Sequence, residues 1–190
     1  GNVSLDLNGF AIVSTSNPAA GDGVHVNPNL ANIAIRNGHI KGQVTYSGGV
    51  FSGPGFLNGI LSVVEATSGK NFRISDVSVA NCMETGIVGN DALIERCFVR
   101  TVGDNGIFGS GAVVESCSAL ECGNYGIQGS SVINSVGASV SSVGLAADVA
   151  TNCTGNGVNN FGLLAESATG CKGFGSGSGT GLRATTATNC

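Results

Sequence analysis

A glycine followed by isoleucine or leucine returns at nearly constant intervals through the C-terminal two thirds of the sequence. Successive pairs are 18 to 20 residues apart, and they are Gly86-Ile87, Gly106-Ile107, Gly126-Ile127, Gly144-Leu145, Gly162-Leu163 and Gly181-Leu182. This period is too short for a helix pair or a propeller blade, and the intervening segments alternate every second residue, as strands do. The repeat therefore predicts an all-β solenoid, whose short parallel strands stack one coil apart at a spacing of ~4.8 Å.

The spacing of the glycines also predicts the organisation of the chain. We expect a single domain over residues 1–190 with about eight coils of 18–20 residues each in its regular part. Residues 1–71 are expected to form irregular N-terminal coils with long loops, because Gly23 and Gly59 are more widely spaced than the later glycines. Residues 72–190 are expected to form the regular coils.

The charge and hydropathy of the chain exclude several classes of protein. Eight basic and twelve acidic residues give a net charge of −4, and the basic residues do not cluster. This composition argues against nucleic acid or an anionic membrane as a partner. No apolar run reaches the ~18 residues that span a bilayer, so no membrane span is expected. With 42% hydrophobic residues, the chain has enough apolar surface to fold.

Five of the seven cysteines follow the repeat and are expected to form one inward ladder. This ladder contains Cys97, Cys117, Cys153, Cys171 and Cys190, with Val136 interrupting it, while Cys82 and Cys122 belong to a second ladder. Parallel side chains in register do not suit the ~90° torsion of a disulfide, so these cysteines are expected to be buried, reduced thiols. A single column also offers no tetrahedral arrangement, and no metal or other cofactor is expected.

One outward ladder is polar and contains the candidate catalytic residues. Its expected members are Ser75, Glu95, Glu115, Asn134, Thr151, Thr169 and Thr188. Glu95 and Glu115 would stand ~5 Å apart, the separation of the carboxylates in retaining glycosidases, with Asp76, Arg96 and Arg100 nearby. An ordinary solvated ion-pair network predicts the same arrangement, so catalysis, glycan binding and a structural role all remain open for these five residues.

The longest departure from the repeat, residues 41–58, contains the candidate ligand-binding residues. It carries Tyr46, Phe51 and Phe56 on a glycine-rich stretch. Loops that project from a rigid scaffold often bind ligands, and an aromatic ring can stack on a pyranose face. The alternative is that these rings cover the coil below.

Two surfaces are candidates for self-association. The outward residue after the corner glycine is apolar in several coils, as at Val88, Phe108 and Leu164, so this face is expected to be covered by the N-terminal loops or by another chain. The sequence ends at Cys190 in the middle of a coil. Because an uncapped coil exposes strand edges, we expect either further coils in a parent protein or pairing with another copy.

The stretch Asn32-Ile33-Ala34-Ile35-Arg36-Asn37-Gly38 and the Gly-Ile/Leu corners resemble the repeats of the pectin lyase-like superfamily. The resemblance covers nearly the whole chain and implies a right-handed single-stranded parallel β-helix. It also implies a bacterial protein that is secreted or displayed at the cell surface. The superfamily includes pectate lyases, polygalacturonases and phage tailspikes, so it leaves the function open.

The catalytic motifs of these relatives are missing from the sequence. There is no Asn-Thr-Asp, no Asp-Asp pair and no Gly-His-Gly. We therefore expect a β-helix scaffold or surface module with polysaccharide as its partner. Two alternatives are a carbohydrate-active enzyme, lyase or hydrolase, or a fragment of one, and a structural, oligomerising rod. Ca²⁺ is expected only under the lyase alternative.

Overall fold

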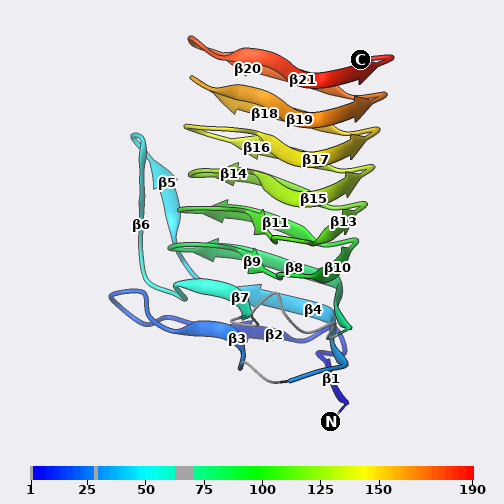
Figure 1. Ribbon diagram of the computed structural model, residues 1–190. Coiled ribbons are helices and arrows are strands. Elements are labelled where there is room, and N and C mark those ends of the chain that lie inside the picture. Colours follow the sequence, from blue (N-terminus) through cyan, green and yellow to red (C-terminus); the bar gives the residue numbers. More distant parts are fainter. Residues whose placement is uncertain (1, 28–29, 63–70) are drawn as a thin grey trace.

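The computed structural model describes residues 2–27, 30–62 and 71–190, and all the regular secondary structure in these ranges is β-strand (Figure 1). The strands before the regular coils are β1 (Val3–Asp6), β2 (Ala11–Val13), β3 (Asp22–Val26), β4 (Ile33–Lys41), β5 (Thr45–Ser47), β6 (Val50–Ser52) and β7 (Asn58–Ser62). Those that follow are β8 (Phe72–Cys82), β9 (Ile87–Val88), β10 (Ala92–Glu95), β11 (Phe98–Val102), β12 (Ile107–Phe108), β13 (Val113–Glu115), β14 (Ser118–Cys122), β15 (Ile127–Ile133), β16 (Val136–Ser139), β17 (Leu145–Thr151), β18 (Thr154–Val158), β19 (Phe161–Thr169), β20 (Lys172–Ser176) and β21 (Thr180–Thr188). The expected all-β fold is confirmed.

Successive coils stack in parallel and in register (Figure 1). Ile94 of β10 lies opposite Ile74 of β8 on one side and Val114 of β13 on the other. The same pairing continues through β15, β17, β19 and β21. In the described residues these ladders form one 19-stranded sheet that winds into a parallel β-solenoid.

The described chain makes about six turns of the solenoid, so the expected number of about eight is wrong. The regular coils begin with β8. Before it, the residues between β4 and β7 do not follow the repeat but form β5 and β6, an antiparallel hairpin that stands beside the stack (Figure 1). The irregular N-terminal coils therefore contribute less regular structure than a count of glycines suggests.

One corner of each coil is occupied by a residue with a positive φ, and these corners fix which side chains point inward. Asn134 has φ +49°, so Ser135 points inward and its hydroxyl accepts a hydrogen bond from the N–H of Cys117 at 3.1 Å. Ser135, and not Val136, therefore interrupts the cysteine ladder, and Val136 is exposed opposite Ser118.

The positive φ of Asn134 also shows that one predicted member of the polar ladder is wrong. Ile133, and not Asn134, lies between Glu115 and Thr151. Val132 and Ile133 are consecutive apolar residues, so the alternation fits two registers one residue apart, and such a shift exchanges the two faces of a strand.

The core is a stack of equivalent positions, and in some of its columns the side chains become smaller along the chain. The residue after the corner glycine is fully buried in most coils, as at Ile87, Ile127 and Leu163, and partly buried at Leu182 in the last one. A facing column shrinks from valine to glycine, in the order Val79, Val99, Ala119, Gly137, Gly155 and Gly173. A Cβ on Gly155 would lie 2.1 Å from the carbonyl oxygen of Gly162, so β18 and β19 meet backbone to backbone. The solenoid therefore narrows towards its C-terminal coils.

The cysteines line this core as expected, with one exception. All seven have free thiols, and six of them are buried, whereas Cys190 is exposed. Cys190 lies on the outermost coil, where no described part of the chain covers it. Within the inward ladder, the Sγ of Cys117 accepts a hydrogen bond from the N–H of Cys97 at 3.4 Å.

No helix in the described residues is long and apolar enough to cross a bilayer.

Candidate functional site

The expected catalytic cluster contains a two-point ion pair on an exposed corner. Arg96 donates from Nε to Oδ1 of Asp76 at 2.7 Å and from a terminal nitrogen to Oδ2 at 2.9 Å. These bonds lower the pKa of Asp76 and raise that of Arg96. Another terminal nitrogen of Arg96 lies 3.9 Å from Oε2 of Glu95. About half of each side chain of the Asp76–Arg96 pair is exposed.

Glu115 and Arg100, the other members of the cluster, form no ion pair with Asp76 or Arg96 among the described residues. Glu95 and Glu115 are opposite each other in β10 and β13, as the repeat predicts. Arg100 does not join them, because its Nε lies 4.0 Å from Oε2 of Glu121. A cavity of about 300 Å³ adjoins Asp76 and Arg96, and neither Glu95 nor Glu115 lines it. This geometry favours the ion-pair network over a catalytic pair.

The aromatic candidates pack on the protein. Tyr46 and Phe51 face each other across the β5–β6 hairpin, with ring centroids 4.6 Å apart. The ring of Phe51 also approaches the turn after β14, where a Cβ on Gly123 would lie 3.3 Å from it. Phe56 is partly buried against the core. These contacts fit rings that cover the coils better than rings presented to a sugar.

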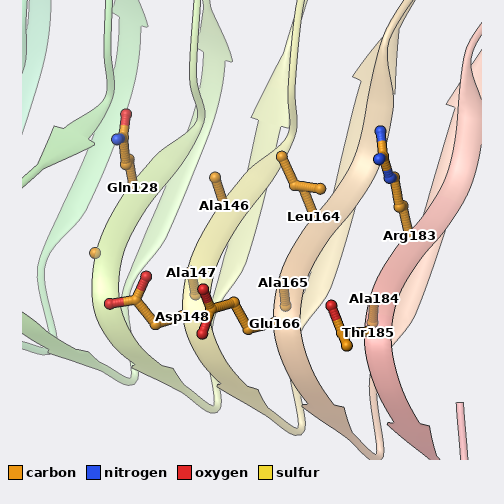
Figure 2. Close-up of a pocket in the computed structure, with 11 residues that line it drawn as sticks. Gln128, Ala146, Ala147, Asp148, Leu164, Ala165, Glu166, Arg183, Ala184 and Thr185 are labelled. Carbon is orange, nitrogen blue, oxygen red and sulfur yellow. The ribbon is translucent and has the colours of Figure 1, made fainter.

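A larger groove lies on another face of the solenoid and crosses four successive coils (Figure 2). It has a volume of about 690 Å³. Strands β15, β17, β19 and β21 supply its lining, which is Gln128, Gly129, Ala146, Ala147, Asp148, Leu164, Ala165, Glu166, Arg183, Ala184 and Thr185. We call this surface the β15–β21 groove.

Small side chains in the middle of each strand produce the groove. Ala147 and Ala165 lie opposite each other, and Ala165 lies opposite Ala184, which leaves a shallow floor. Figure 2 shows two rows of side chains on either side of this floor, and all of them except Ala146 are larger than the alanines of the floor. One row contains Gln128, Ala146, Leu164 and Arg183, and the other contains Asp148, Glu166 and Thr185.

The groove is open at Leu164, which corrects one expectation. The sequence predicts that Val88, Phe108 and Leu164 are covered by the N-terminal loops or by another chain, and the structure corrects the first of these alternatives at Leu164. The β5–β6 hairpin instead packs near the turns after β11 and β14, and Leu164 is a half-buried wall of the groove. The hairpin starts early in the solenoid, and its few residues do not extend over the later coils (Figure 1).

The second row of the groove is acidic. Asp148 and Glu166 hold equivalent positions in successive coils, between the paired residues Ala147–Ala165 and Val149–Ser167, so their backbones are about 4.8 Å apart. Both side chains are exposed, and no ion pair in the described part of the chain involves either of them. Arg183 stands in the opposite row, 5.3 Å above the ring centroid of Phe161.

Our reading of the sequence did not select these two carboxylates, although a signal for them exists. Asp148 and Glu166 each come four residues after a corner glycine, Gly144 and Gly162. The equivalent residues in neighbouring coils are uncharged, as Ser130 and Thr185 are, so the column does not read as a charged motif. Only the bend of the strands shows that this column borders a groove.

The described residues contain no group of three or more His, Cys, Asp or Glu side chains that could hold a metal ion. Comparison with models of protein families, with curated proteins and with solved structures found no match. Arguments about function therefore rest on the geometry of the solenoid and its groove.

Proposed function

We propose that this β-solenoid is a polysaccharide-binding module that takes a glycan chain along the β15–β21 groove. The observation that carries the proposal is a groove of about 690 Å³ that crosses four coils and mixes apolar and polar walls. Leu164 offers apolar contact, while Gln128 and Thr185 offer an amide and a hydroxyl for hydrogen bonds. A sugar chain needs both, because its rings have apolar faces and its rims carry hydroxyls.

The scaffold supports the same proposal. Each wall residue sits on a strand that pairs in register with its neighbours, so the walls are held at a fixed spacing of about 4.8 Å per coil. A rigid array loses little conformational entropy when a repeating ligand binds. We further propose a β-helix of the pectin lyase-like kind, secreted or displayed at a bacterial surface, on the strength of the Gly-Ile/Leu corner repeat.

A second candidate function is glycoside hydrolysis, and the stacked Asp148 and Glu166 favour it. Their backbones lie one coil apart, about 4.8 Å, so the two carboxyl groups can reach the separation of about 5 Å that retaining glycosidases use. The appearance of new reducing ends, lost in the Glu166→Gln variant, would support this candidate over binding alone.

Affinity gel electrophoresis with immobilised polysaccharides tests the proposed binding. We expect at least one polysaccharide to retard the protein and the Leu164→Ala variant to be retarded less. Val88→Ala is the matched control, because Val88 occupies the equivalent outward position in an earlier coil, outside the groove lining. Equal retardation of the two variants, or no retardation by any neutral, acidic or basic polysaccharide, would contradict the proposal. In the latter case, end-to-end assembly seen by light scattering would favour the structural rod.

A further inference from the structure

The β15–β21 groove carries more negative than positive charge, and this charge bears on which glycans it can bind. Asp148 and Glu166 place two carboxylates on one wall, against the single guanidinium of Arg183 on the other. Neither carboxylate forms an ion pair with a described residue, so their negative potential is not neutralised by the protein. A polyuronate chain laid in this groove would meet like charges, and a neutral chain would leave both carboxylates without a charged partner.

We infer that the groove prefers a glycan with free amino groups, such as a glucosamine polymer, and this inference rests on the proposed polysaccharide binding. An ammonium group has three N–H donors and can bond both carboxylates of a pair that stands one coil apart. Arg183 already has a partner in the ring of Phe161, so it competes less for these carboxylates. The groove is thus expected to prefer cationic glycans, whereas a surface that binds polyuronates would prefer anionic ones.

Two other cations fit the groove less well. Ca²⁺ takes six to eight oxygen ligands, and the second row supplies the two carboxylates and the hydroxyl of Thr185. A polybasic peptide would find carboxylates only at Asp148 and Glu166, because the rest of the lining is alanine, glycine, leucine, the amide of Gln128, the hydroxyl of Thr185 and the guanidinium of Arg183, which would repel it. Because apolar and hydroxyl or amide side chains surround these two carboxylates, the groove favours a sugar chain that carries amino groups at intervals.

Calorimetric titration with oligomers of one length separates the outcomes. The probes are the glucosamine hexamer, the N-acetylglucosamine hexamer and the galacturonate hexamer, with hexalysine as the peptide. We expect the glucosamine hexamer to bind about fivefold more tightly than its N-acetylated form, the effect of one or two exposed charge pairs. This difference should shrink as salt is raised, because exposed charges are screened.

The double variant Asp148→Asn, Glu166→Gln should bind the two hexosamine oligomers equally. Glu115→Gln is the control, because it removes one charge from a neighbouring column outside the groove lining and should keep the full preference.

The other outcomes of the titrations distinguish a failure of the amino-sugar preference from a failure of polysaccharide binding. Equal binding of the two hexosamine oligomers to the parent protein would overturn the amino-sugar preference and leave polysaccharide binding intact. Tightest binding of the galacturonate hexamer or of hexalysine would also overturn the preference, the latter in favour of a basic peptide. If no oligomer binds, and no polysaccharide retards the protein in gels, the proposed function fails and the preference fails with it.

Discussion

At the scale of the residue, the left-handed corner of each coil combines a backbone requirement with a choice of side chain. Asn152 has φ +52°, and its amide donates to Oδ1 of Asn134 in the coil below at 3.3 Å. At the same position two earlier coils carry Asp76 and Arg96, with φ +57° and +50°. Asn and Asp tolerate this region better than most residues, whereas arginine has no such advantage. The Asp76–Arg96 ion pair therefore compensates for an unfavourable corner residue, which is a structural role.

The first prediction concerns the pH dependence of that corner. Asp76→Asn keeps a side chain suited to φ +57° and removes the charge that bonds Arg96. Because the pKa of Asp76 is lowered in the folded protein, its contribution to stability is present above the unfolded pKa and is lost as the pH falls through the folded value. We expect the variant to be less stable than the parent by at most about 1 kcal/mol at neutral pH and equally stable in strong acid.

Urea unfolding at neutral pH and at about pH 2 measures this difference in the free energy of unfolding. A difference of the same size at both pH values would contradict the assigned role of the charge.

The second prediction concerns the thiols. Burial raises the pKa of Cys82 to about 12 and that of Cys153 to about 11, so neither forms much thiolate at mildly alkaline pH. Cys190 is exposed. A thiol reagent should therefore modify one cysteine in the folded protein and all seven after unfolding. The Cys190→Ser variant should lose the fast reaction. Rapid modification of several thiols under native conditions would show that the cysteine ladder is not closed.

At the scale of the element, the sequence predicts the strands that recur in every coil. It does not predict a local register that depends on the position of a single residue. The glycines before Ile87, Ile107 and Ile127 predict the parallel strands and their inward residues, because the same pattern recurs at the same interval in successive coils. The segment around Asn134 is predicted one residue out of register, because Val132 and Ile133 are both apolar and the local alternation fits either of them as the inward residue. The groove was missed since it depends on where β17 and β19 bend.

The third prediction tests the backbone contact between β18 and β19. A Cβ on Gly155 would lie 2.1 Å from a carbonyl oxygen on the facing strand, and neither backbone can yield. On Gly89 the nearest atoms are the Cδ1 of Ile94 at 3.1 Å and the Cβ of Ala92 at 3.2 Å, the first of which ends a flexible side chain. We expect Gly155→Ala to destabilise by about 1–3 kcal/mol and Gly89→Ala by clearly less. Chemical unfolding of both variants is the measurement, and equal costs would argue against the backbone contact.

At the scale of the whole molecule, the solenoid is a one-dimensional stack that tapers. Each coil packs mainly on its two neighbours, so stability is close to a sum of coil and interface contributions. The inward column that contains Ile74 and Ile94 in the early coils contains Ala150 and Ala168 in the late ones. Since the free energy of burial scales with apolar area, the early coils contribute more per interface than the late ones.

The fourth prediction follows from this taper. We expect amide hydrogen exchange to be slowest in β8, β11 and β14 and to become faster through β18 to β20. Mass spectrometry of peptic fragments resolves these segments. Uniform protection along the stack would show that the smaller core side chains of the late coils are fully compensated by the closer approach of their backbones.

A glycan that lies in the β15–β21 groove should change the fluorescence of a single reporter placed on the groove wall. The chain has no tryptophan, so Leu164→Trp introduces one fluorophore into the groove, and Phe174→Trp introduces one at an exposed position of β20 outside the groove lining. Both variants are titrated with the glucosamine and N-acetylglucosamine hexamers while tryptophan emission is recorded. We predict a saturable change in emission for Leu164→Trp and none for Phe174→Trp. An unchanged Leu164→Trp signal, or an equal response from Phe174→Trp, would contradict glycan binding in this groove.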